Sequence, residues 1–456
     1  MVCKSSLYSI SPLDGRYKDQ LNEVRSIFSE YAFLKNKLFV EVSWIKNLLN
    51  INKILNINYS KKEVFSFLND IVINFNEADA CEIKKIENVI KHDVKAVEYF
   101  LRNKLLKNQY FCHIIEYVHF GCTSEDINNI SYGLMINEVK KNIFLSFWIK
   151  IAKFIKNLSF KYKDISILCR THGQPATPST LGKEFFIFYM RIKKQIYQLK
   201  KINILAKFNG TTGNYNAHYF AHPEVNWIKI SRRFVTSLGL EWNPYTAQNE
   251  PHDYIAELFH CIIRFNNILL DLNRDLWMYI SFGYFKQKLI DQEVGSSIMP
   301  HKINPINFEN SEGNIGLANS LMVYMSEKLP ISRLQRDLSD STVLRNIGVA
   351  VGYSVLAYSS FLLGLNRITI NIKNIDKDLN NNWSILAEPI QTIMKAHRIK
   401  NSYEKLKTMT RGKKINKDII HNFIKNLNLP HDIKMKLLNL TPKNYIGKSS
   451  ILVENI

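Results

Sequence analysis

The stretch YIAELFHCIIRFNNILLDLNRDLWMYI, residues 254–280, decides the fold class of this chain. Its apolar residues recur every three or four positions, which is the period of an α-helix with one apolar face. A helix of this length extends roughly 40 Å, at about 1.5 Å per residue. The stretch therefore predicts a long rod, whose apolar face consists of Ile255, Leu258, Ile262, Phe265, Leu269, Leu272 and Leu276.

Outside this stretch, the same period predicts further long helices over residues 137–158, 182–206, 308–329 and 341–365. Alternating patterns typical of β-strands are nearly absent. We therefore predict an all-α fold in which several long helices form a bundle. The expected domains are an N-terminal helical domain, a central long-helix domain and a C-terminal helical domain, over residues 1–111, 112–365 and 366–456.

Residues 347–365 carry no charged side chain and are numerous enough to cross a bilayer. Three glycines and three serines interrupt this stretch, and the sequence has no second one like it. A helix that is apolar on all sides is also what the centre of a large bundle requires. We favour the buried bundle helix over a membrane span. The first residues lack the apolar core of a signal peptide, and we expect a cytoplasmic protein.

The formal net charge is +21, from 61 Lys and Arg against 40 Asp and Glu. One interpretation is a nucleic-acid-binding protein. The other is a general excess of lysine, because the lysines are scattered through every segment. We favour the second and expect no specific nucleic-acid site. The six cysteines form no C-x-x-C pair, as in proteins of a reducing compartment.

Several common cofactor motifs are missing from the sequence. The Gly447-Lys448-Ser449 tripeptide resembles the end of a phosphate loop, but Pro442 stands where the first glycine is required. His218 and His222 have helical spacing without the glutamate of an H-E-x-x-H zinc motif. No G-x-G-x-x-G fingerprint occurs. We therefore expect neither a metal nor a cofactor.

The most informative segment for function is GSSIMPHKINP, residues 295–305. Its glycine and two serines make a flexible chain rich in hydroxyl and backbone donors. Lys302 and Asn304 add a cation and an amide that can grip a carboxylate. The composition alone also fits an ordinary turn between helices. The ordered string instead favours a mobile loop that closes over an anionic substrate.

Two other breaks between helices carry candidate groups. The segment RTHGQPATP, residues 170–178, holds His172 where glycine and proline forbid a regular helix. Histidine serves as an acid or base near neutral pH, although a structural cap is an equal alternative for this fragment. The segment GCTSEDINN, residues 121–129, starts a helix, where Thr123 and Ser124 either cap the backbone or hold an anion.

Taken together, these segments resemble the adenylosuccinate lyase family, a branch of the fumarase/aspartase superfamily, in its bacterial form. The loop string specifies only the superfamily. The strings SPLDGRY, HDVKAVEYF, RTHGQPATPST and RDLSDSTVLRN narrow the resemblance to the purine branch. The resemblance implies a three-domain fold, a tetrameric bundle of the long central helices, and active sites shared between subunits.

The resemblance also implies a reaction and its residues. The reaction is β-elimination of fumarate from a succinyl-purine nucleotide, with Ser296 as base, His172 as acid and Glu309 orienting His172. Lys91 departs from the family pattern, in which a small or amide residue stands at this position. The residues expected to bind substrate are Arg16, Tyr17, Lys91, His92, Asp93, Thr123, Ser124, Gln248, Ser297, Lys302, Asn304, Asn310, Arg336, Ser341 and Arg345.

Two alternatives stay open at this point. A sister fumarate-releasing enzyme, such as an argininosuccinate lyase, shares the loop chemistry but does not need the phosphate-binding arginines. A catalytically silent relative would keep the fold for a structural or nucleic-acid-binding role. The intact set of His172, Ser296, Lys302 and Asn304 argues against that loss.

Overall fold

The computed structural model describes most of the chain, namely residues 7–51, 54, 60–108, 111–288, 290, 295, 297–412 and 414–454. Ser296 lies outside the described residues. The chain divides into two compact units, which are described separately below. Unit 1 comprises Met1–Phe147, Gln195–Asn267 and Gly313–Tyr358, and unit 2 comprises Trp148–Lys194, Ile268–Glu312 and Ser359–Ile456.

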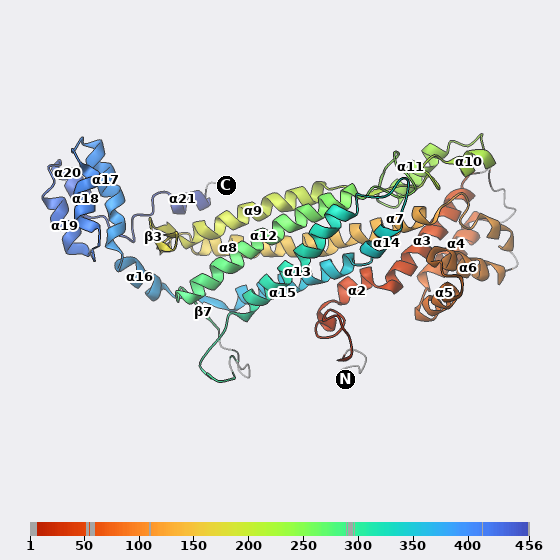
Figure 1. The fold of residues 1–456 in the computed structure, drawn as a ribbon, viewed down its shortest axis with the longest axis horizontal. Helices are drawn as coiled ribbons and strands as arrows, with labels where there is room; N and C mark the ends of the chain where they lie inside the picture. The colour runs from red at the N-terminus through yellow and green to blue at the C-terminus, as the bar shows by residue number, and fades with distance from the viewer. Residues whose placement is uncertain are drawn as a thin grey trace. The chain divides into compact units, whose positions relative to one another are not determined.

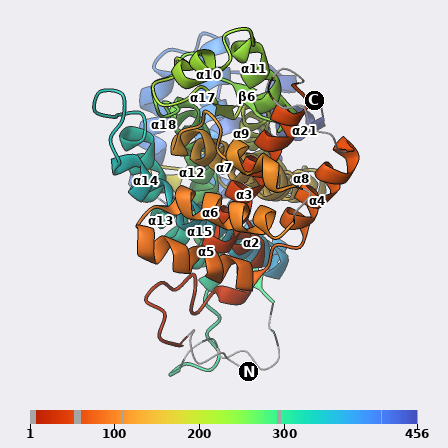
Figure 2. The same cartoon turned by 90° about the vertical axis from the view of Figure 1, so that its right-hand side faces the viewer.

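Unit 1 is helical apart from one pair of two-residue strands. Its helices α2, α4, α5, α6 and α7 pack against α3 (Figures 1 and 2). The elements are η1 Lys18–Gln20, α2 Asn22–Phe28, α3 Glu30–Leu49, α4 Lys61–Ile73, α5 Glu77–Ile90, α6 Asp93–Leu106, η2 Cys112–Tyr117, α7 Ser124–Glu138, the π-helix η3 Val139–Phe144, β5 Leu205–Ala206, α10 Asn216–Ala221, α11 Trp227–Ser237, β6 Glu241–Trp242 and α14 Ser339–Leu344.

Unit 2 combines helices with short hairpin strands, and its helices α17 to α20 form one cluster (Figure 1). The elements are β1 Ser166–Ile167, β2 Arg170–Thr171, β3 Gln174–Pro175, β4 Ser179–Thr180, β7 Phe285–Gln287, β8 Ile368–Ile370, α16 Ile372–Asn380, η4 Trp383–Leu386, α17 Ala387–Ala396, α18 Ser402–Thr410, α19 Lys417–Lys425, α20 His431–Leu438 and α21 Ser449–Glu454. The long helices contribute residues to both units, and they are α8 Leu145–Lys161, α9 Leu181–Lys201, α12 Asp253–Ser281, α13 Ile306–Lys328 and α15 Ile347–Arg367.

The short strands form four two-stranded sheets. Strands β1 and β4, β2 and β3, and β7 and β8 pair antiparallel, whereas β5 and β6 pair parallel. In β2–β3, Thr171 pairs with Gln174, so the hairpin turns over two residues. An all-α fold with long central helices is therefore confirmed, and the strands only join or brace helices. The division into three domains stays a prediction.

One apolar core of unit 1 lies among α3, α4, α5 and α6. Leu38, Leu68, Ile83 and Phe100 are each fully buried in it. The helix α5 begins at Asn76, whose side chain accepts from the amides of Ala78 and Asp79 in a capping box. Burial of one apolar face per helix and capped helix ends together stabilise this core.

The stretch 347–365 forms α15, and the most apolar 18-residue window of its region is 67% buried. Gly348 lets α2 approach closely, because a Cβ there would lie 2.5 Å from the Cβ of Phe28. Val351 and Leu356 are likewise buried. The burial supports a bundle helix rather than a membrane span.

Three expected helix boundaries are wrong. The helix expected over 182–206 ends at Lys201, because residues 204–206 bond instead to 241–243. The helix expected over 137–158 already begins at Ser124 and passes through the π-helix η3. The helix expected over 341–365 is divided at Arg345 and Asn346 into α14 and α15. Tertiary hydrogen bonds and capping, rather than apolar periodicity, set these ends.

Candidate active site

The N-termini of α6 and α7 bring two predicted substrate-binding motifs together in unit 1. His92 caps α6, and its Nδ1 accepts from the backbone N–H of Lys95 at 3.1 Å. Because Nδ1 accepts, the neutral imidazole carries its proton on Nε2, which lies 3.4 Å from the Ser124 hydroxyl. Thr123, one residue earlier, donates its backbone N–H to the Asp126 carboxylate at 2.8 Å. The two caps therefore hold His92, Thr123 and Ser124 in one place.

Asp93 connects this corner to Arg345. Its Oδ2 lies 2.5 Å from the Lys37 ammonium and 3.5 Å from the Arg345 guanidinium. Burial opposes ionisation of Asp93, but the two cations outweigh it and hold the pKa of this carboxyl below its usual value. Arg345 also pairs with Glu30 at 3.3 Å. The guanidinium is thus held between two carboxylates.

Arg336 is held in the same manner. It forms an ion pair with the buried carboxylate of Glu125 and lies 3.5 Å from that of Asp340. Asp340 in turn accepts the backbone N–H of Ser341 at 2.6 Å. The predicted residues Arg336 and Ser341 therefore share one carboxylate, and the side chain of Arg336 is only 16% exposed.

His252 lies behind this arginine and was not singled out from the sequence. Its ring is 2% exposed, with Nε2 3.5 Å from Asp340 and Nδ1 3.6 Å from Glu250. Burial opposes ionisation of Asp340, yet the nearby His252 ring and the Arg336 charge lower the pKa of this carboxyl below its usual value. Burial raises the pKa of Glu250. Asp340 is therefore an anionic partner of Arg336, alongside Glu125.

Two cavities open beside Arg345. The larger has a volume of about 360 Å³ and is lined by Asp14, Arg25, Glu30 and Arg345 together with apolar side chains. The second, of about 160 Å³, shares Glu30 and Arg345 with the first. A small polar cavity is lined by Asp93, Glu125, Arg336 and Ser341. These cavities place an arginine next to space for a ligand.

Three further predicted residues are exposed or half-buried in unit 1. Arg16 is exposed on a turn in which the backbone N–H of Tyr17 donates to the Pro12 carbonyl at 2.9 Å. The Arg16 guanidinium lies 5.8 Å from the centre of the Tyr17 ring. Lys91 ends α5 in the left-handed conformation, with φ 56°. The described contacts bring neither Arg16 nor Lys91 to the Asp93–Arg345 pair.

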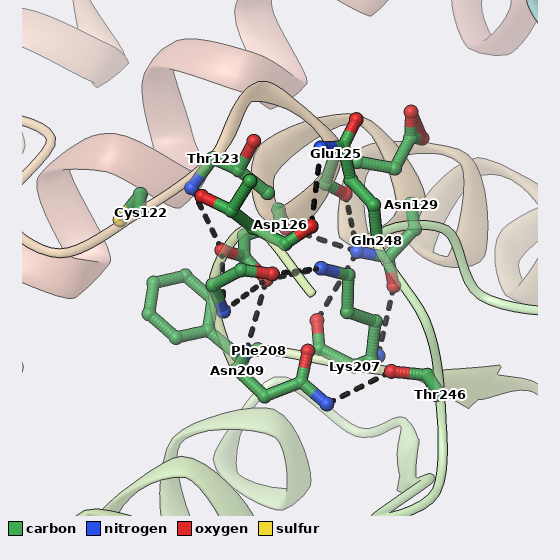
Figure 3. A network of polar contacts seen from close by, with 12 residues as sticks. Cys122, Thr123, Glu125, Asp126, Asn129, Lys207, Phe208, Asn209, Thr246 and Gln248 are labelled. Carbon is green, nitrogen blue, oxygen red and sulfur yellow. Dashed lines mark hydrogen bonds and ion pairs between the residues drawn. The ribbon is translucent and has the colours of Figure 1, made fainter. Parts of the chain in front are cut away.

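Gln248 lies on a loop that is tied to two others. Its side-chain amide donates to the Thr211 carbonyl at 3.1 Å, and its backbone N–H donates to the Gln335 carbonyl at 3.2 Å. Figure 3 shows Gln248 together with the polar network around Asp126 and Lys207. Gln335 directly precedes Arg336. One network thus connects the predicted substrate residues Thr123, Gln248 and Arg336.

In unit 2, His172 occupies the tip of the β2–β3 hairpin and is exposed. His172 and Gly173 both have positive φ, 54° and 74°, as a type I′ turn requires. At the base of the hairpin, Arg170 pairs with Asp378 at 2.5 Å and donates to the Tyr284 hydroxyl at 3.0 Å. The anchored base holds the turn while the imidazole stays accessible.

The loop that contains Ser296 closes on itself at its two ends. The Asn304 side-chain amide donates to the Gly295 carbonyl at 2.9 Å. A Cβ at position 295 would lie 2.1 Å from the Lys302 carbonyl oxygen, so this close approach requires glycine. Ser297 and Lys302 are exposed. Asn304 therefore shapes the loop, while Ser297 and Lys302 face outward.

Glu309 and Asn310 lie near the start of α13, and each has a partner on a neighbouring helix. The Glu309 carboxylate accepts from the Trp277 indole at 3.1 Å, and the side-chain amide oxygen of Asn310 accepts from the Ser360 hydroxyl at 2.7 Å. Within this chain the described contacts of Glu309 do not reach His172. Orientation of His172 by Glu309 stays a prediction that depends on assembly.

Sequence reasoning missed the charged partners of its own candidates. Lys37, Glu125 and Asp340 lie buried against predicted residues, and Lys207 is buried against Asp126, yet periodicity alone marks none of them. An available signal was the run of acidic residues directly after Ser124 and beside Ser341. Among the described residues, no group of three His, Cys, Asp or Glu side chains is arranged to hold a metal ion. The expectation of no metal stays a prediction.

Two family models together match almost the whole chain. Residues 15–318 match the lyase family, and residues 332–446 match the adenylosuccinate lyase C-terminal domain. Among solved structures, a 3-carboxy-cis,cis-muconate lactonizing enzyme from Pseudomonas putida has a TM-score of 0.75 at 16% identity, over 95% of each chain. A fumarate lyase from Mesorhizobium sp. BNC1 has the same TM-score and identity, over 95% of this chain and 97% of that one. At this identity the likeness shows the fold.

The relatives found by sequence share far more identical residues with this chain than those two solved structures do. The adenylosuccinate lyase of Buchnera aphidicola subsp. Schizaphis graminum is 59% identical over 452 residues, and that of Escherichia coli K12 is 50% identical over 452 residues. Each alignment covers 99% of both chains. The chain therefore belongs to the lyase family and, within it, to the adenylosuccinate lyases. It is an enzyme of the lyase class.

Proposed function

We propose that this enzyme eliminates fumarate from adenylosuccinate, giving AMP, and from succinylaminoimidazole carboxamide ribotide, giving AICAR. Membership of the family supports the reaction. The observation that carries the substrate class is the cluster of Arg336, Ser341 and Arg345 beside cavities in unit 1. Guanidinium groups bind phosphate and carboxylate oxygens through paired hydrogen bonds.

The two arginines differ in how accessible they are. Arg345 is 41% exposed and lines both larger cavities, whereas Arg336 is mostly buried between carboxylates. We assign Arg345, together with Arg16 from the N-terminal turn, to the substrate phosphate. The rest of the nucleotide contacts a second group of residues, namely His92, Asp93, Thr123, Ser124 and Gln248. The caps of α6 and α7 support this assignment, because they hold His92, Thr123 and Ser124 in one place.

The chemistry requires a base and an acid on opposite sides of the breaking bond. Ser296 removes the proton next to a succinyl carboxylate, the carbon–nitrogen bond then breaks, and His172 donates a proton to the departing nitrogen. A serine hydroxyl is a weak base, so loop amides and Lys302 stabilise its alkoxide. Lys302 and Asn304 also stabilise the extra charge on the carboxylate of the intermediate, and Glu309 orients His172.

We further propose a cytoplasmic homotetramer whose sites are shared between subunits, without a metal, a cofactor, a nucleic-acid partner or a membrane. The exposure of His172 and Lys302 supports sharing, because an exposed group is available to a second subunit. A tetramer with D₂ symmetry forms such sites in equivalent copies.

A fumarate assay on the purified, assembled protein tests the proposal. We expect release from both succinyl-purine nucleotides and none from argininosuccinate, with and without EDTA. Inactivity on both purine substrates would overturn the assignment. Turnover of argininosuccinate would support the sister enzyme, and activity that disappears with EDTA and returns with a divalent ion would contradict metal independence.

A further inference from the structure

Among the described residues of unit 1, the most completely buried ion pair lies at the N-terminus of α7. The Lys207 ammonium and the Asp126 carboxylate are 2.9 Å apart, and both side chains are 0% exposed. Asp126 also accepts the backbone N–H groups of Thr123, Asn209 and Gly210, at 2.8, 3.0 and 3.1 Å. Lys207 also donates to the Gly210 carbonyl at 3.0 Å. Figure 3 shows these contacts gathered around the Asp126 carboxylate.

A second residue fastens the same two segments. The Asn129 amide donates to the Lys207 carbonyl at 3.1 Å, and its oxygen accepts the Lys207 N–H at 2.9 Å. Asn129 lies in the second turn of α7 and is 2% exposed. Its contacts fix the position of the Lys207 backbone relative to the start of the helix.

The network continues from this pair to the loop of Gln248. The Asn209 side chain donates to the Thr246 hydroxyl at 2.8 Å, and Gln248 donates to the Thr211 carbonyl at 3.1 Å. The segment at Gly213 packs closely against the segment at Thr246, since a Cβ on Gly213 would lie 2.1 Å from the Thr246 carbonyl oxygen. The segment 207–213 therefore lies between Thr123–Ser124 and Gln248 and sets the distance between them; we call it the spacer.

An ion pair this deep is not needed for stability alone. The desolvation of two charges is costly, and an apolar pair of similar volume is often as stable. The many backbone bonds to Asp126 instead define where each segment lies, because each bond specifies a direction and a distance. The pair thus specifies geometry around residues that we assign to the substrate.

We infer that Asp126 and Lys207 are positioning residues that hold Thr123, Ser124 and Gln248 in register for substrate binding. This inference rests on the proposed function. Removal of both charges moves the binding groups without removing any of them. The enzyme then binds substrate more weakly, while proton transfer by His172 and Ser296 changes less.

The test compares Asp126→Asn/Lys207→Met with the parent tetramer. No charge is left unpaired in this double variant, so we expect a folded protein. We expect KM for adenylosuccinate to rise about tenfold or more, with kcat reduced by a smaller factor. The matched control is Asp79→Asn/Lys104→Met, which removes another ion pair of unit 1, 2.7 Å apart, and leaves KM unchanged.

Combination with Ser124→Ala separates positioning from a general loss of stability. If the Asp126–Lys207 pair acts through Ser124, the two effects on KM are less than multiplicative. The reason is that Ser124→Ala removes the hydroxyl that the ion pair would position. A folded double variant with KM within about twofold of the parent, or fully multiplicative effects, would overturn the inference. An inactive parent enzyme would instead refute the proposed function.

A milder variant keeps the test decisive if the charge-neutral protein does not fold. Thr246→Val preserves shape and removes the hydroxyl that accepts from Asn209. We expect an intact fold by circular dichroism and KM raised about threefold or more, since one hydrogen bond of the spacer is lost. A folded Thr246→Val enzyme with the parent KM would contradict the inference.

Discussion

The two units present their candidate groups in opposite ways. In unit 1, Arg336 and Asp93 are buried or half-buried and paired with opposite charges. In unit 2, His172 and Lys302 are exposed on a hairpin tip and a loop. Groups that recognise a ligand benefit from a rigid, preorganised frame. Groups that meet substrate only in a closed, assembled site need freedom to approach it.

The same contrast appears in the carboxylates. Asp340 of unit 1 has a lowered pKa because the His252 ring and Arg336 outweigh its burial. Asp275 of unit 2 has a pKa raised to about 6, because burial and the neighbouring Asp271 and Glu184 carboxylates disfavour its charge. Neighbouring groups therefore compensate the charge of Asp340 in unit 1, whereas the charge of Asp275 in unit 2 is poorly compensated.

The strongest way to break the comparison is to remove the proposed proton-transfer groups. His172→Ala and Ser296→Ala should each lose nearly all activity, by roughly 10³-fold or more, because each removes a proton-transfer group. His172→Ala should remain tetrameric with an unchanged melting temperature, since His172 is exposed. We expect the same of Ser296→Ala, which removes only one hydroxyl. Steady-state fumarate release and light scattering measure the two properties.

Mixing these two variants tests whether sites are shared. After dissociation and reassembly in equal amounts, each site has a half chance of each intact residue. About a quarter of the sites should then regain activity if His172 and Ser296 come from different subunits. Tagged mixed tetramers confirm exchange. Confirmed mixed tetramers without activity would refute sharing.

In unit 1 the equivalent test is Arg336→Met. It leaves Glu125 and Asp340 buried without their cation, so we expect a loss of about 3–5 kcal/mol in unfolding free energy. KM should rise by about one to two orders of magnitude, because the binding groups lose their frame. Urea unfolding and kinetics measure these changes. The control is Arg333→Met, whose side chain is 86% exposed and whose loss should change neither quantity.

Glycine substitutions sharpen the difference in rigidity. Gly213→Ala should cost about 2–4 kcal/mol in stability, because φ is +80° and a Cβ would contact the Thr246 carbonyl at 2.1 Å. Gly173→Ala in the His172 hairpin should cost only about 1 kcal/mol, since φ is +74° but nothing lies within 4 Å. Thermal unfolding compares the two. Equal costs would mean that the segment at Gly213 yields as easily as the hairpin.

The smallest effect concerns pH. The pKa of Asp275 in the folded protein, about 6, exceeds its usual value of 3.8, so the folded protein binds more protons between these values. The unfolding free energy should therefore fall as pH rises from about 4 to 6 and stay level above that. Asp275→Asn should stabilise by about 1–2 kcal/mol at pH 8, after allowance for partial exposure. Urea unfolding at pH 4 should show no such gain, and a gain independent of pH would contradict the explanation.

Part of the site was predictable from local sequence. The start of α7 after Thr123 follows from its capping residues, and the break in helical structure around His172 follows from the glycine and prolines of 170–178, although the β2–β3 hairpin itself was not predicted. The periodicity of residues 254–280 matches α12 within one residue at each end. These features need only neighbours along the chain, so sequence patterns report them directly.

By itself, then, the sequence determined the all-α class, the long rods, the helix caps and the family. Only the tertiary structure decided that Lys207 pairs with Asp126, that Arg336 lies between Glu125 and Asp340, and that residues 204–206 leave the helix for a strand pair. The physical reason is range. Periodicity and capping arise within a few turns of chain, whereas a buried ion pair depends on which distant segments share the low-dielectric interior.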